Sequence, residues 1–262
     1  MQKIKINGFD LAFERHGVSA PLVLIHGYPL GHTIWEKIVP LLEKDFDLIL
    51  PDIRGFGQSG TVVKTYTMAD LASDIAGLLD HLKIEKAFVA GHSMGGYVAL
   101  AFARAYPQRL AGLGMISSQV LADPLERKEG RYKTAAEVAE KGVGLVADAM
   151  ASKLSGDQSL QSFAHDLIGR QKAAGIIGAL KAMAERSDSN DTLAAIKVPL
   201  VIVHGDADAL IPVERGREMK ETVPGADYVE LSGVGHMPMM ENPQAVAGAL
   251  KSFVNDGGVD QR

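Results

Sequence analysis

The chain has 262 residues, of which 47% are hydrophobic and 23% charged, proportions typical of a globular protein with a large core. A formal net charge of −5 argues against non-specific nucleic-acid binding, and no apolar run approaches the roughly 20 residues of a membrane span. The absence of cysteine excludes disulfides, thiolate metal sites and a cysteine nucleophile. The first ten residues lack the apolar core of a signal peptide, so we expect a cytoplasmic protein.

The first predicted element is a hairpin over residues 3–15, in which alternating side chains flank the turn-forming pair Asn7-Gly8. Strand-like and helix-like stretches then take turns, and Thr67 with Asp70 resembles a capping box at the start of one helix. In chain order the patterns predict a strand at 21–26, a helix at 35–42, a strand at 47–51, a helix at 67–82, a strand at 86–90, a helix at 95–106 and a strand at 110–116.

The alternation breaks in the segment 119–191, which has no convincing strand and whose composition predicts several helices. Alternating elements predict an α/β fold with a mostly parallel central sheet flanked by helices. Because ligands of such sheets bind at the carboxyl ends of the strands, we expect residues 1–118 and 192–262 to form the core and 119–191 to form a helical cap. Beyond the cap the patterns predict a strand at 198–203, a helix at 213–222, a strand at 228–231 and a last helix that starts at Pro243 behind Asn242.

Gly91-His-Ser-Met-Gly95 matches the pattern G-x-S-x-G between a predicted strand and a predicted helix. In that setting the serine lies on a sharp turn, and small neighbours are needed because larger ones would clash with the adjacent strand and helix. A glycine-rich helix start with an inert serine is the alternative. The flanking strand and helix favour Ser93 as a nucleophile.

A serine hydroxyl needs an adjacent base, and histidine is the usual one because its pKa lies near neutrality. Among the eight histidines, His236 lies in a glycine-containing loop after the last predicted strand, where it can approach the serine. His204 ends a strand and is expected to be buried, and His92 is expected to point away from the serine. His81 and His165 fall on helical stretches. No pair of histidines has metal-ligand spacing, so we expect no metal.

The imidazole in turn needs an anion that fixes its tautomer. The loop after the 198–203 strand offers Asp206 and Asp208, and the residues alone leave the choice between them open. The chain order serine, aspartate, histidine differs from that of the chymotrypsin and subtilisin types.

Stabilising the developing oxyanion requires two backbone N–H groups aimed at it. We expect one from Met94, which directly follows the nucleophile. The other is expected from Tyr28, in the loop His26-Gly-Tyr-Pro-Leu30 after the first parallel strand, since Pro29 has no N–H. A plain glycine turn is the alternative for this loop.

Gly55-Phe-Gly-Gln-Ser-Gly60 spells the dinucleotide-binding pattern G-x-G-x-x-G, with Asp80 further along. That pattern binds a pyrophosphate only where a helix begins within it. Here the helix signal starts near Thr67, so we expect no nucleotide cofactor and a loop that shapes the sheet edge.

Taken together, these motifs resemble the α/β-hydrolase fold family in its serine-nucleophile branch, over nearly the whole chain. The chain is most similar to small microbial carboxylesterases, 3-oxoadipate enol-lactonases and cofactor-free haloperoxidase-like esterases. The resemblance implies a triad without a cofactor, and it assigns the acid to Asp208, the second aspartate of the G-x-x-D loop. Relatives with an aspartate nucleophile are disfavoured by Ser93. The motifs that carry the resemblance are 26–29, 52–59, 91–96, 205–208 and 235–236.

We therefore expect a carboxylesterase that cleaves small-molecule esters with short-to-medium acyl chains through an acyl-enzyme, and that binds neither nucleic acid nor membrane. Tyr132 and Phe163 are the aromatic residues of the 119–191 segment, which favours aliphatic acyl chains of modest size. A lactonase or a carbon–carbon bond hydrolase with the same triad is the alternative, and a non-catalytic ligand receptor on the same scaffold is a further one.

Overall fold

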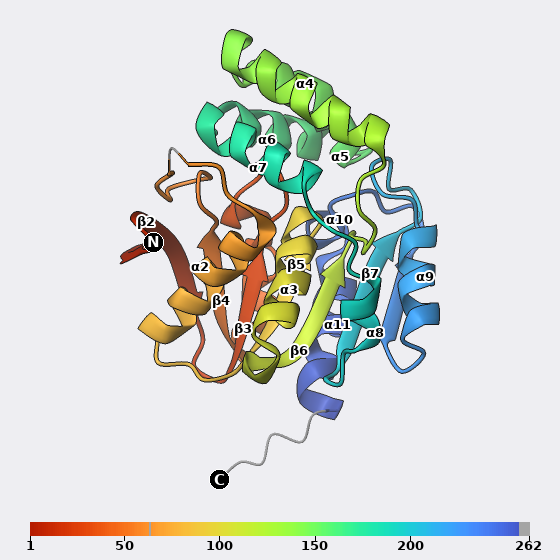
Figure 1. Cartoon of the computed structure of the whole chain (residues 1–262). Helices are drawn as coiled ribbons and strands as arrows, with labels where there is room; N and C mark the ends of the chain where they lie inside the picture. Colours follow the sequence, from red (N-terminus) through yellow and green to blue (C-terminus); the bar gives the residue numbers. More distant parts are fainter. Residues whose placement is uncertain (63, 257–262) are drawn as a thin grey trace.

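The computed structural model describes residues 1–62 and 64–256. Eight strands form one sheet in the order β1-β2-β4-β3-β5-β6-β7-β8 (Figure 1). β2 runs antiparallel to both of its neighbours and the other pairs are parallel, which confirms the predicted mostly parallel sheet. The strands are β1 (Gln2–Ile6), β2 (Phe9–His16), β3 (Ala20–Ile25), β4 (Phe46–Asp52), β5 (Ala87–His92), β6 (Leu110–Ile116), β7 (Leu200–Gly205) and β8 (Asp227–Leu231).

Helices cover both faces of the sheet. α2, α3 and α8 lie on the face toward the viewer in Figure 1, and α11 lies behind the sheet, where α1 packs against it. The helices of the core are η1 (His32–Trp35), α1 (Val39–Leu42), α2 (Met68–His81), α3 (Met94–Ala105), η2 (Pro107–Arg109), α8 (Asn190–Ala194), α9 (Glu214–Thr222), α10 (Pro238–Glu241) and α11 (Pro243–Asp256).

Four further helices follow β6 and lie above the carboxyl ends of the strands in Figure 1. α4 packs against α7, and α5 packs against α6. Of the helices in the described ranges, none is long and apolar enough to cross a membrane. The four are α4 (Leu125–Lys141), α5 (Gly144–Leu154), α6 (Gln158–Gly169) and α7 (Ala173–Ala184).

Local sequence signals account for most element boundaries. The capping box is confirmed, since Thr67 Oγ1 accepts from the Asp70 N–H while the Asp70 carboxylate accepts from the Thr67 N–H. The predicted helix over 35–42 is correct only in its second half: η1 ends at Trp35 and a separate α1 covers Val39–Leu42. Pro40 lies in the first turn of α1, where its missing N–H costs nothing, whereas inside a longer helix it would remove a hydrogen bond.

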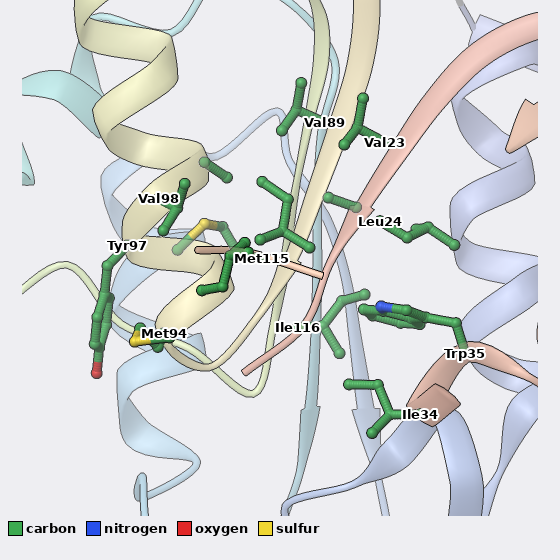
Figure 2. Close-up of a cluster of buried hydrophobic side chains, with 14 of the residues drawn as sticks. Val23, Leu24, Ile34, Trp35, Val89, Met94, Tyr97, Val98, Met115 and Ile116 are labelled. Carbon is green, nitrogen blue, oxygen red and sulfur yellow. The ribbon is translucent and has the colours of Figure 1, made fainter. Parts of the chain in front are cut away.

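The core lies on both faces of the central strands, as Figure 2 shows. Side chains from η1 pack against one face and side chains from α3 against the other. Because both faces of β3, β5 and β6 are covered, these strands are apolar except for His92 at the end of β5, and they position the loops at their carboxyl ends. The labelled members of this cluster are Val23, Leu24, Ile34, Trp35, Val89, Met94, Tyr97, Val98, Met115 and Ile116.

Candidate active site

Ser93 lies between β5 and α3 in a strained backbone conformation, with φ +52° and ψ −115°. A non-glycine residue at positive φ costs free energy and persists where its surroundings impose it. Here the Ser93 N–H donates to the Ile116 carbonyl (2.9 Å), and the Ser93 carbonyl accepts from the Gly96 N–H (2.9 Å) and the Ser118 hydroxyl (2.8 Å). These bonds hold the turn, and the Ser93 side chain stays partly exposed.

The glycines around Ser93 are required by close backbone contacts. A Cβ at Gly91 would lie 2.1 Å from the Gly95 carbonyl, and a Cβ at Gly95 would lie 2.3 Å from the Ile25 carbonyl oxygen. Real side chains do not make such short contacts, so a substitution at Gly91 would push α3 away from β5, and one at Gly95 would push it away from β3. The close packing of the backbone around the turn therefore explains why small residues are needed on both sides of the serine.

His236 follows β8, and its side chain is 1% exposed. Its Nδ1 lies 2.7 Å from Asp208 Oδ2, and the Asp208 carboxylate has no exposed surface. The other carboxylate oxygen, Oδ1, accepts from the N–H groups of Leu210 (2.8 Å) and Ile211 (3.0 Å). Asp208 thus fixes the His236 ring with one oxygen while the backbone fixes Asp208 through the other.

The environment of Asp208 keeps it ionised. Burial by itself would raise the pKa of this carboxyl, but the charge of His236 and the hydrogen bonds that Asp208 accepts hold its pKa well below the usual range. His204 contributes from the buried end of β7: its Nε2–H donates to the Ile211 carbonyl (2.9 Å), and the same nitrogen lies 3.5 Å from Asp208 Oδ2. The expected buried, structural place for His204 matches its position.

Asp206, the other candidate acid, is exposed, and its carboxylate contacts the backbone of a neighbouring loop and not the imidazole. Its Oδ1 accepts from the Gly233 N–H (2.7 Å), which ties the β7–α9 loop to the β8–α10 loop. The structure therefore brings Asp208, and not Asp206, against His236.

The loop after β3 is held by His26, which has no exposed surface. Its Nδ1 lies 2.9 Å from the Gly27 carbonyl, which can only accept, so Nδ1 carries the proton and Nε2 accepts from the Ile53 N–H (3.1 Å). Burial lowers the pKa of His26, which agrees with this neutral form. Among the described residues, the N–H groups of Tyr28 and Met94 donate to no protein acceptor. Both amides are thus available to a ligand.

The G-x-G-x-x-G loop has no helix within it, as expected, because α2 starts at Met68. It folds instead around the buried carboxylate of Asp52, which accepts from the N–H groups of His32 (2.9 Å) and Gln58 (2.8 Å). A Cβ at Gly57 would lie 2.1 Å from this carboxylate. Only glycine at position 57 leaves room for the Asp52 carboxylate to approach the backbone this closely.

Comparison with known proteins agrees with this architecture. The family model for the alpha/beta hydrolase fold matches residues 20–243. The chain belongs to the alpha/beta hydrolase fold family. This confirms the resemblance drawn from the motifs.

Three relatives illustrate the range of activities among similar alpha/beta hydrolases. A thermophilic esterase from Thermogutta terrifontis has 36% sequence identity and a TM-score of 0.93, over 98% of this chain and 99% of its own. The enol-lactonase from Burkholderia xenovorans has 25% identity and a TM-score of 0.89, over 97% of this chain and 100% of its own. The pimeloyl-[acyl-carrier protein] methyl ester esterase of Aeromonas hydrophila is 28% identical over 94% of this chain and 95% of its own.

Two residues that hold the site of this alpha/beta hydrolase were not singled out from the sequence. Glu241, in α10, accepts from the N–H of Gly235 (2.9 Å) and of Met237 (3.2 Å), on either side of His236. Ser118 holds the carbonyl of Ser93. A carboxylate five residues after the histidine was a visible signal for the first, whereas nothing local marks the second.

Proposed function

We propose that this alpha/beta hydrolase is a serine carboxylesterase that acts on short-to-medium acyl esters through an acyl-enzyme. The observation that carries the proposal is the 2.7 Å hydrogen bond between His236 Nδ1 and Asp208 Oδ2. The backbone carbonyl of His236 is in turn hydrogen-bonded to His92, the residue before Ser93. A partly exposed hydroxyl, a buried imidazole and an ionised carboxylate are the groups that nucleophilic ester hydrolysis requires.

In the first half of the proposed reaction, Ser93 Oγ attacks the ester carbonyl carbon and His236 Nε2 takes the hydroxyl proton. Asp208 accepts a hydrogen bond from Nδ1–H and stabilises the imidazolium. The N–H groups of Tyr28 and Met94 stabilise the oxyanion, and loss of one such donor costs about 3–4 kcal/mol in related sites. The tetrahedral intermediate then collapses, the C–O bond to the alcohol breaks, and the alcohol leaves with the proton from His236.

In the second half, His236 takes a proton from water, and the resulting hydroxide attacks the acyl carbon. The bond to Ser93 Oγ breaks, the serine regains its proton from His236, and the carboxylic acid leaves. None of these steps needs a metal or a cofactor.

We also propose that the segment 119–191 acts as a cap that shapes the substrate site. A cleft of about 410 Å³ lies between Tyr28, Leu210 and the helices α4, α5 and α7, a volume suited to a small molecule. Leu145 and Met150 of α5 and Leu180 of α7 offer it an apolar surface for an aliphatic group. The charged residues Arg127, Arg131, Glu137 and Lys153 line other parts of the cleft. Tyr28 and Leu210 belong to the loops that carry the oxyanion donor and the acid.

A lactonase is the second candidate, and the likeness to the Burkholderia xenovorans enol-lactonase favours it. The same triad opens a lactone, with the difference that the leaving alcohol stays attached to the acyl group. Rates on aryl esters and on enol-lactones, measured side by side, distinguish the two.

The test is hydrolysis of p-nitrophenyl esters of graded acyl length by the parent enzyme and by Ser93→Ala. We expect the parent to prefer short-to-medium chains, a fluorophosphonate to label Ser93, and Ser93→Ala to lose several orders of magnitude in kcat. An unlabelled Ser93, or a Ser93→Ala variant as active as the parent, would contradict the proposal and leave a ligand-binding role.

A further inference from the structure

His92, directly before Ser93, does not point into solvent or simply into the core. Its side chain is fully buried, and its Nε2 lies 2.7 Å from the backbone carbonyl oxygen of His236, 144 residues further along the chain. The two imidazole rings lie 4.8 Å apart between centroids, with 56° between their planes. One side chain thus joins the turn of the nucleophile to the loop of the base.

The chemistry of this contact fixes the state of the His92 ring. A carbonyl oxygen only accepts, so Nε2 carries the proton and donates it. Burial lowers the pKa of His92 well below its usual value, and the nearby His236 lowers it further, so the ring stays neutral. Its Nδ1 has no hydrogen-bond partner among the described residues. A neutral His92 adds no charge that would compete with the imidazolium of His236.

The ring also borders the oxyanion loop. A Cβ at Gly27 would lie 2.5 Å from His92 Nδ1, so only glycine permits this packing. His92 therefore contacts all three segments on which the proposed chemistry depends: the oxyanion loop, the nucleophile turn and the base loop.

The backbone of His236 is held by few other groups. Its N–H donates to the carbonyl of Leu154 (3.0 Å), at the end of α5, and its carbonyl accepts from His92. With the side chain bound to Asp208, rotation of the residue is restricted at three points. Of these three contacts, the hydrogen bond from His92 connects the backbone of the base directly to the residue next to the nucleophile.

We propose that His92 is a positioning residue for the base: its Nε2–H holds the His236 carbonyl so that the His236 imidazole stays aligned with the Ser93 hydroxyl. This inference rests on the proposed function of Ser93 and His236. It assigns His92 no contact with substrate.

Two amide variants of different reach test the proposal. In His92→Gln the amide nitrogen extends about as far as Nε2 of histidine and can still donate to the His236 carbonyl. In His92→Asn the same amide group is shorter, at the level of Nδ1, and cannot. We expect His92→Gln to keep kcat close to that of the parent. We expect His92→Asn to lower kcat on the order of 10- to 100-fold with little change in KM, as small misplacements of catalytic groups do.

A second readout separates positioning from a general loss of folded protein. Rates are expressed per active site titrated with a fluorophosphonate, on p-nitrophenyl butyrate and on ethyl butyrate. Ethoxide needs a proton from His236 to leave, whereas p-nitrophenolate does not. Misalignment of the base should therefore reduce the His92→Asn rate more on the ethyl ester, and His92→Gln should restore both rates.

Equal activities of the two variants, or equal losses on both esters, would overturn the proposal. If neither variant folds, the parent decides: a His92 Nε2 proton that exchanges with solvent as fast as that of an exposed histidine also overturns it. Failure of the proposed function looks different, because the parent would then not be labelled at Ser93.

Discussion

Replacing Asp208 by asparagine tests the site more sharply than removing the side chain. The carboxylate oxygen Oδ1 accepts from two backbone N–H groups, at 2.8 and 3.0 Å, and Oδ2 lies 2.7 Å from His236 Nδ1. In Asp208→Asn the amide oxygen can keep the two backbone bonds, which directs the NH2 group at His236. Two donors would then face each other, so the imidazole must adopt the tautomer with the proton on Nε2. That tautomer cannot accept the proton of Ser93.

The magnitude follows from this tautomer change. In other serine hydrolases the corresponding substitution lowers kcat about 10⁴-fold. At about 1.36 kcal/mol per tenfold, this is roughly 5 kcal/mol of lost transition-state stabilisation. The matched control is Asp206→Asn, in which the amide oxygen keeps the bond to Gly233 on an exposed loop. For this control we expect a stability change of at most about 0.5 kcal/mol and nearly unchanged activity.

The assay is kcat/KM on p-nitrophenyl butyrate for the parent and both asparagine variants, with the folded fraction checked by thermal unfolding. The reasoning is refuted if the Asp206 and Asp208 variants lose activity equally, or if Asp208→Asn stays within tenfold of the parent.

Two predictions concern stability. Arg54 and Asp74 form a buried ion pair with two hydrogen bonds of 2.6 Å. Arg54→Met should lower the free energy of unfolding in urea by about 3–5 kcal/mol, because it leaves the buried carboxylate without its cation. A decrease below about 1 kcal/mol would contradict this. His32 Nδ1 lies 2.8 Å from Asp52 Oδ1, and despite burial this pair raises the pKa of His32 and lowers that of Asp52. The raised pKa of His32 stabilises the folded state fully below about pH 6.5, and this stabilisation is lost as the pH rises through the folded-state pKa. The stabilisation from the lowered pKa of Asp52 is lost only in acid, below about pH 4. His32→Gln should therefore destabilise the protein more at pH 5.5 than at pH 8.5; an equal difference in unfolding free energy at the two pH values would refute it.

Local patterns were sufficient for most of the fold. The strand predicted at 110–116 coincides with β6, and the capping box placed the start of α2 correctly. Both signals depend on near neighbours: side-chain alternation, burial of apolar runs, and hydrogen bonds over three residues. The error in the first half of the helix predicted at 35–42 also arises from local reasoning. The helical period alone was considered, and the helix-breaking effect of Pro40 was left out.

For the candidate site, the sequence supplied the residue types and their order, because the loops at the carboxyl ends of parallel strands meet at one edge of the sheet. The residues alone left the choice between Asp206 and Asp208 open, since two positions in one loop have the same chemistry and differ only in direction. The family resemblance assigned the role to Asp208. The tertiary structure turns Asp208 toward His236 and Asp206 toward Gly233, and it brings His92 to a carbonyl 144 residues away. Side-chain direction at a loop depends on what the neighbouring loops allow, and those neighbours are defined only when the sheet is assembled.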